Sequence, residues 1–162
     1  MVKGNDMFKT RKKVFANGKK IACKTVVIMF IMFVITVPVY AYSTNWAMEM
    51  STNGRIVDGE KNGAFHKLDA GKVSINGTIF THSNANGNGQ PTNKLHFSLY
   101  NKTSGNYFGS IDAKPSGYAY GEVDFSGTYE ESVGGGTKYY LYIWRSESDG
   151  THVSASGKLK NE

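Results

Sequence analysis

Alternation of apolar and polar residues is the dominant signal between residues 72 and 159. From Val73 to Ile79, apolar residues or glycine alternate with small polar residues. This period of two predicts an extended strand with one buried and one solvated face, continuing to about Ser83. Short runs rich in aromatic and β-branched residues recur at residues 95–100, 107–113, 118–129, 138–145 and 153–159. The pattern therefore predicts six strands.

Turn-forming residues separate these runs. Residues 84–93 are nearly all of turn-forming types and predict a flexible loop. Residues 101–106 predict the turn of a hairpin, and glycines at residues 134–136 and 149–150 predict two further turns. The sequence thus predicts an all-β domain, either a small antiparallel β-sandwich or a partly open barrel, of about six to eight strands.

The predicted β domain covers residues 65–162. The preceding segment, residues 42–64, is weakly patterned and is expected to be a weakly ordered lead, or an edge strand through Trp46 and Met48. The only cysteine, Cys23, lies before both segments. No disulfide is therefore available to the domain, and its hydrophobic core must stabilise the fold.

Residues 1–41 have the pattern of a secretory signal peptide. A basic segment at residues 1–25 precedes an apolar core at residues 26–37, which would form a signal helix. A small residue ends the segment, and cleavage is expected between Ala41 and Tyr42. The protein is therefore expected to be secreted and extracellular.

A retained membrane anchor through residues 25–41, with the domain outside, is the alternative. The twelve-residue apolar core would be about 18 Å long at a rise of about 1.5 Å per residue. The hydrocarbon layer of a bilayer is ~30 Å thick, so length favours cleavage over anchoring. Contact with the membrane is expected only through this segment, before cleavage.

The net charge of the whole chain, +6, belongs to the leader. Eight of the 19 bases and one of the 13 acids lie in residues 1–41, which leaves eleven bases and twelve acids in residues 42–162. These bases are scattered singly among acids, as on a solvated surface. The sequence therefore gives no argument for nucleic acid as a partner.

Two carboxylates, Glu122 and Asp124, would lie on one side of a predicted strand, roughly 7 Å apart. The segment partly resembles the Glu-x-Asp-x-x-Glu strand of laminarinase-like jelly-roll glycosidases, in which the first Glu is the nucleophile and the last the acid/base. Ser126 or Gly127 stands where the second Glu is required, and the domain is too short for that family's two large sheets. We therefore expect no enzyme and place both acids on a solvated strand face.

Metal-binding and nucleophilic motifs are equally weak. The histidines are far apart in sequence and lack the spacing of a zinc site: His66, His82, His96 and His152. Asp58 and Glu60 begin a faint calcium-loop pattern, but Asp69 stands where the bidentate glutamate would be. No metal or cofactor is expected.

Aromatic residues give the best functional lead. In the strand predicted at residues 138–145, Tyr140, Tyr142 and Trp144 share the face opposite Leu141 and Ile143. If the aliphatic residues face the core, these rings form an exposed stripe, and Tyr118 and Tyr120 of the preceding strand are candidates to join it. Such rings suit stacking on sugars or anchoring a protein partner. The alternative is that residues 42–64 cover the stripe.

These observations predict a secreted, non-enzymatic β-sandwich protein, a binding module for cell-surface or environmental polysaccharide or for protein. Small size, export and the lack of a catalytic set fit equally well a small antimicrobial effector or its protective partner. An N-terminally membrane-anchored extracellular domain and an exported enzyme of unrecognised type are the remaining alternatives.

Overall fold

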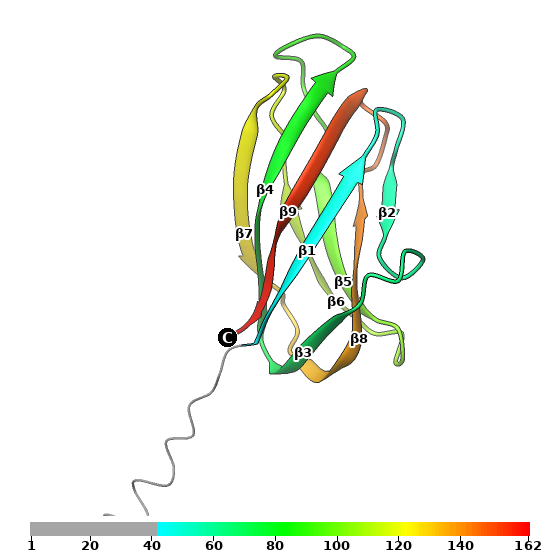
Figure 1. Ribbon diagram of the computed structural model, residues 1–162, viewed down its shortest axis with the longest axis vertical. Coiled ribbons are helices and arrows are strands. Elements are labelled where there is room, and N and C mark those ends of the chain that lie inside the picture. The colour runs from blue at the N-terminus through cyan, green and yellow to red at the C-terminus, as the bar shows by residue number, and fades with distance from the viewer. Residues whose placement is uncertain (1–41) are drawn as a thin grey trace, which may run out of the picture. The chain divides into compact units, whose positions relative to one another are not determined.

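The computed structural model describes residues 42–162, so the predicted leader, its apolar core and the cleavage point after Ala41 lie outside the described residues. Nine strands are present in the described part of the chain (Figure 1). They are β1 Ser43–Met50, β2 Ile56–Asp58, β3 His66–Gly71, β4 Val73–Asn84, β5 Leu95–Asn101, β6 Tyr107–Ala113, β7 Glu122–Thr128, β8 Val133–Trp144 and β9 Thr151–Asn161. No helix long and apolar enough to cross a membrane occurs in residues 42–162.

The strands form two antiparallel sheets packed face to face. One sheet has the order β1-β9-β4-β7, and the other has the order β2-β8-β5-β6 with β3 also paired to β8. Figure 1 shows β1, β9 and β4 side by side in one layer and β5, β6 and β8 in the layer behind them. The predicted antiparallel β-sandwich is confirmed, and the short strands β2 and β3 add to the predicted set.

Residues 42–64 are part of the sandwich. All of β1 pairs with β9, from Ser43 opposite Lys160 to Met50 opposite Val153. Trp46, Met48 and Met50 are buried in the core, and this burial of apolar surface holds β1 in place as an edge strand. The sandwich therefore begins at Ser43, ahead of the boundary expected at residue 65.

The predicted strand from Val73 and the predicted hairpin at residues 95–113 are confirmed as β4, β5 and β6. The turn predicted at residues 134–136 is wrong, because these glycines lie inside β8, where Gly134 and Gly136 pair with β3. Gly135 and Gly136 have φ of +81° and +139° and so distort the strand without ending it. The chain bends earlier, at residues 130–131.

The strand predicted from residue 118 begins only at Glu122. Residues 114–121 form the loop that carries the chain from β6 in the five-stranded sheet to β7 in the four-stranded sheet. Within β7, Phe125 turns inward and packs on the Trp46 and Phe97 rings, at centroid distances of 5.9 and 4.5 Å. Glu122 and Asp124 are exposed on the outer side, as predicted.

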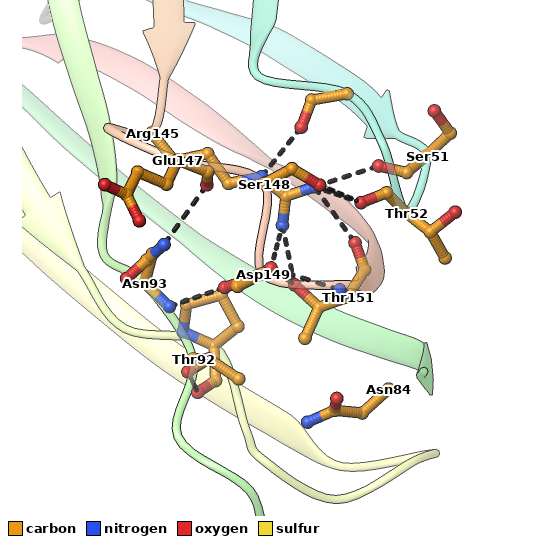
Figure 2. Close-up of polar contacts among 12 residues, drawn as sticks. Ser51, Thr52, Asn84, Thr92, Asn93, Arg145, Glu147, Ser148, Asp149 and Thr151 are labelled. Carbon is orange, nitrogen blue, oxygen red and sulfur yellow. Dashed lines mark hydrogen bonds and ion pairs between the residues drawn. The ribbon is translucent and has the colours of Figure 1, made fainter. Parts of the chain in front are cut away.

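Arg145 is buried, with 1% of its surface exposed, although the sequence placed it among solvated bases. Its guanidinium donates to four backbone carbonyls, a hydroxyl and a carboxylate (Figure 2), which come from Ser51, Thr52, Gly54, Thr151 and Asp149. Arg145 directly follows β8, the strand that carries Tyr140, Tyr142 and Trp144. Its hydrogen bonds connect the β1–β2 loop to the β8–β9 loop. Because every donor has a partner, this buried charge is structural.

Asp149 completes this clamp, which we define as Arg145, Asp149 and Thr151. Its carboxylate accepts hydrogen bonds from the backbone N–H of Asn93, at 2.5 Å, and of Thr151, at 3.1 Å. Burial alone would raise the pKa of Asp149, but a hydrogen bond from the Thr151 hydroxyl, the two backbone bonds and the charge of Arg145 bring this pKa below its usual value. The end of the loop at residues 84–93 is thereby fixed to the same cluster (Figure 2).

Candidate binding groove

The five predicted binding residues do not form one surface. Tyr140, Tyr142 and Trp144 lie on the outer face of β8, in the five-stranded sheet, and are half-buried. Tyr118 and Tyr120 lie in the loop at residues 114–121 and are exposed. Tyr120 contacts Phe80 of the four-stranded sheet, so the two groups of rings belong to opposite sides of the sandwich.

The rings of β8 are paired with rings of neighbouring strands. Trp144 stacks on His96 of β5 with centroids 4.1 Å apart and planes inclined by 22°. Its indole Nε1 donates to Ser98 Oγ at 3.2 Å, and His96 Nδ1 lies 2.6 Å from Asp112 Oδ1. One face of the indole is thus covered and its polar atom is satisfied within the protein.

Tyr140 is held in the same way. It stacks on Tyr100 at 5.7 Å with planes 17° apart, and Phe65 meets it edge to face at 6.3 Å. Partial burial and the neighbouring Glu60 carboxylate raise the pKa of Tyr140 to about 12. We call the outer side of β5 and β8 the ring-paired face. Of residues 42–64, which the sequence offered as a cover, β1 lies in the other sheet and β2 pairs alongside β8, whereas Glu60 lies against Tyr140.

The outer face of the four-stranded sheet carries a groove of about 810 Å³ that crosses all four strands. Its polar walls come from two rows of residues in register: Asn45, Lys158 and Asn76 in one, and Ala47, Ser156, Thr78 and Asp124 in the other. Thr78 Oγ1 donates to Asp124 Oδ1 at 2.5 Å. The groove therefore offers amides, hydroxyls, one carboxylate and one ammonium group.

Glycines form the row between these two. Gly77 of β4 pairs with Gly157 of β9, with Trp46 and Phe125 at either end of the row. A Cβ at Gly157 would lie 1.9 Å from Asn76 O, and one at Gly77 would lie 2.6 Å from Trp46 Cζ2. A side chain at either glycine would clash, so backbone atoms form the bottom of the groove. The Trp46 ring fills the space beneath this row, in the core of the sandwich.

An aromatic cluster lies farther along β4, beyond the residues that line the groove. Phe80 follows Thr78 on the same face, contacts His82 at 4.8 Å, and His82 stacks on His152 at 4.6 Å. Tyr120, 79% exposed, lies 6.4 Å from Phe80, measured between ring centroids. An exposed tyrosine thus lies beside Phe80 on the groove sheet, beyond the residues that line the groove.

Tyr120 has φ of +62°, the only positive value among the non-glycine residues described. It occupies the third position of a turn closed by a hydrogen bond from Gly121 N to Tyr118 O, 3.2 Å long, and its own N–H donates to Thr81 O at 2.6 Å. This position favours glycine or asparagine, and a bulky side chain costs roughly 1–2 kcal/mol there. Tyr118, 63% exposed, lies beside Gly89 of the neighbouring loop.

The histidines, scattered in sequence, are partly gathered by the fold. His152 Nε2 lies 2.7 Å from Glu49 Oε1, next to His82, whereas His66 is buried beside Thr44 and its pKa is lowered by that burial. Even so, no group of three or more His, Cys, Asp or Glu side chains placed to hold a metal ion occurs in residues 42–162. The pairing of His82 with His152 required the β4–β9 register, which the sequence did not reveal.

No protein-family model matches the chain, and no curated protein matches its sequence. Among solved structures, an arabinose-bound α-L-arabinofuranosidase has 8% identity over 76% of this chain with a TM-score of 0.43. The VP2 subviral particle of infectious bursal disease virus has 15% identity over 75% of this chain with a TM-score of 0.39. A mitogen of Yersinia pseudotuberculosis has 15% identity over 73% of this chain with a TM-score of 0.35. The chain covers 18%, 32% and 85% of these chains, respectively. These distant similarities assign no function.

Proposed function

We propose that this protein is a secreted, non-enzymatic module that binds polysaccharide in the groove of the four-stranded sheet. The observation that supports this most is a groove lined by amides and hydroxyls on a sheet whose adjoining loop carries two exposed tyrosines, Tyr118 and Tyr120. Export rests on the signal-peptide pattern of residues 1–41.

The chemistry of the groove suits a chain of sugar units. Hydroxyl groups of a sugar both donate and accept, and Asn45, Asn76 and Asp124 provide complementary donors and acceptors. Neighbouring strands lie about 4.8 Å apart, so the row from Asn45 to the β7 edge is roughly 14 Å long. An extended ligand crossing the strands would meet a polar group from each of them.

The tyrosines supply the apolar part of recognition. A sugar ring has an apolar face of C–H groups that packs on an aromatic ring, and a tyrosine offers a rigid area at little entropic cost. Tyr120 keeps its strained backbone although asparagine would relieve it, which favours a role for the side chain. On the ring-paired face, by contrast, Trp144 and Tyr140 already stack on protein neighbours.

Retention on insoluble glycans tests the proposal. Protein purified after expression of the full chain is mixed with cellulose, chitin or isolated peptidoglycan, and the bound fraction is measured. The double variant Tyr118→Ala/Tyr120→Asn is expected to lose at least tenfold in affinity for the glycan that retains the parent, about 1.4 kcal/mol. Tyr107→Ala is the matched control, because Tyr107 is also an exposed tyrosine (47%) but lies in β6 of the other sheet.

Two outcomes contradict the proposal. If Trp144→Ala abolishes retention while the double variant keeps it, the binding surface is the ring-paired face. If no glycan retains the parent, polysaccharide binding is refuted, and inhibition of neighbouring bacteria by the purified protein then tests the effector alternative.

A further inference from the structure

A second cavity opens at one edge of the sandwich and is separate in position from the exposed tyrosines. β1 lies beside β2 and β3 at this edge (Figure 1), and a pocket of about 330 Å³ lies between β1 and the loop at residues 59–65. Buried core residues from both sheets form its apolar lining, among them Trp46, Met48, Leu141 and Ile143. We call it the side pocket.

The loop that covers the side pocket is fixed by its own hydrogen bonds. Gly59 N donates to Leu141 O at 3.0 Å, and Ala64 N donates back to Gly59 O at 2.8 Å. The Asp58 carboxylate accepts from Glu60 N at 3.0 Å. The pocket is therefore preformed, as small-molecule sites usually are.

The polar groups of the side pocket are all uncharged side chains. None of the described residues that line it is Asp, Glu, Lys or Arg, and the residues with polar side-chain atoms are Thr44, Asn45, Asn62, His66 and Trp46, of which Asn45 and Trp46 also line the groove. His66 is buried, its Nδ1 lies 3.3 Å from Thr44 Oγ1, and burial lowers its pKa, so the ring is neutral at pH 7. A charged ligand would find no counter-ion here.

The Trp46 indole N–H is a donor without an acceptor. Trp46 is 6% exposed, and its Nε1 is the only buried side-chain nitrogen or oxygen in residues 42–162 that lacks a hydrogen-bond partner. Leaving such a donor unpaired costs roughly 1–3 kcal/mol, and orphaned groups of this kind call for an explanation. The other tryptophan, Trp144, has its N–H satisfied by Ser98.

We infer that the side pocket binds a small uncharged aromatic molecule that carries a hydrogen-bond acceptor, and that the Trp46 N–H donates to that acceptor. The apolar lining holds the ring of the ligand, the missing counter-ions exclude ions, and the unpaired donor selects for an acceptor. Because the N–H is closed off from solvent, binding includes a small displacement of the indole. This inference does not rest on polysaccharide binding.

Three probes of similar size test the inference: acetophenone, ethylbenzene and benzoate. Each is titrated at pH 7 into protein purified from the full chain, and the indole N–H signals are followed by NMR, with Trp144→Phe used to assign them. Acetophenone is expected to shift the Trp46 signal saturably and to bind at least tenfold more tightly than ethylbenzene, which lacks the acceptor, or benzoate, which is charged. No saturable shift with acetophenone, or equal affinity for ethylbenzene, overturns the inference.

Two variants locate the site. Ala64→Phe places a ring at the mouth of the pocket and is expected to abolish acetophenone binding while leaving glycan retention unchanged. Trp46→Phe keeps most of the apolar volume but removes the donor, so ligand-detected NMR should then find acetophenone and ethylbenzene bound equally. Unchanged acetophenone binding in a folded Ala64→Phe protein refutes this location, and a persisting preference in Trp46→Phe refutes the role of the indole.

Discussion

The two outer faces of the sandwich use aromatic residues in opposite ways. On the five-stranded sheet, Trp144 and Tyr140 are half-buried and stack on rings of β5. On the four-stranded sheet the central positions are small and polar, and the exposed rings, Tyr118 and Tyr120, come from an adjoining loop. An aromatic-rich strand is thus a poorer indication of a binding surface than an aromatic residue whose ring is exposed.

Cross-strand register explains the contrast. His96 is directly opposite Trp144 and Tyr100 is opposite Tyr140, so their side chains are within stacking distance across the β5–β8 pair. In the four-stranded sheet, the outward-facing central pairs are polar, Asn76 with Lys158 and Thr78 with Ser156, and the glycine pair between them faces inward. Ring pairing stabilises one sheet, whereas the other keeps an open polar surface.

The largest effect is expected from Arg145→Met, which removes the support common to both faces. It leaves the Asp149 carboxylate buried without its cation and several backbone carbonyls without donors, and we expect the free energy of unfolding to fall by about 3–5 kcal/mol. Urea unfolding measures this. The exposed Arg55 is the matched control, and Arg55→Met should change stability by no more than about 0.5 kcal/mol. Equal effects of the two substitutions would refute the clamp.

Gly157→Ala should damage the groove sheet selectively. The added methyl would overlap the backbone of Asn76, so β4 and β9 must separate, and we expect a loss of about 1–3 kcal/mol together with weaker glycan retention. Gly134→Ala in the other sheet is the control, because a Cβ there meets nothing within 4 Å. A stability loss in Gly134→Ala as large as that in Gly157→Ala would contradict this reasoning.

Trp144→Ala should cost stability but leave glycan retention intact. The substitution removes a half-buried ring stacked on His96 and a hydrogen bond to Ser98, and we expect a loss of about 2 kcal/mol in urea unfolding. Retention is measured below the unfolding transition, where the variant is still folded. Weakened retention of the folded variant would erase the distinction between the two faces.

Tyr120→Asn should weaken glycan retention without lowering stability. Asparagine tolerates the positive φ, so stability should stay level or rise by up to about 1 kcal/mol, while affinity for the glycan falls about tenfold. Urea unfolding and glycan retention on the same preparation provide both numbers. A large stability loss would show that the Tyr120 ring is structural.

The smallest expected effect is the contribution of His66 to the pH dependence of stability. His66 lies at the edge of the sandwich, away from both outer faces. His66 takes up a proton near pH 6.5 in the unfolded chain, whereas burial lowers its pKa in the fold. Below pH 6.5 the unfolded state therefore binds more protons than the folded state. The free energy of unfolding decreases as the pH is lowered, until the pH reaches the pKa of His66 in the folded protein. Between about pH 7 and pH 5, His66→Gln should lose less stability than the parent. Equal losses would show that His66 does not contribute.

Sequence reasoning was sufficient for the fold class and insufficient for the assembly of the surface. The period of two identified β4 and the β5–β6 hairpin because one face of each strand is buried. It could not assign strands to sheets, and so it joined Tyr118 and Tyr120 to the ring of Trp144 across what are opposite sides of the sandwich. The burial of Arg145 was likewise hidden, because its partners are mainly backbone carbonyls from distant loops.

The pairing of β1 with β9 has a consequence for how the protein matures. β1 pairs only with β9, so Trp46 of β1 cannot be buried in the completed core until β9 has been synthesised. Closing so long a chain segment is entropically slow. During synthesis from the N-terminus, the core therefore cannot be completed until β9 is available to pair with β1.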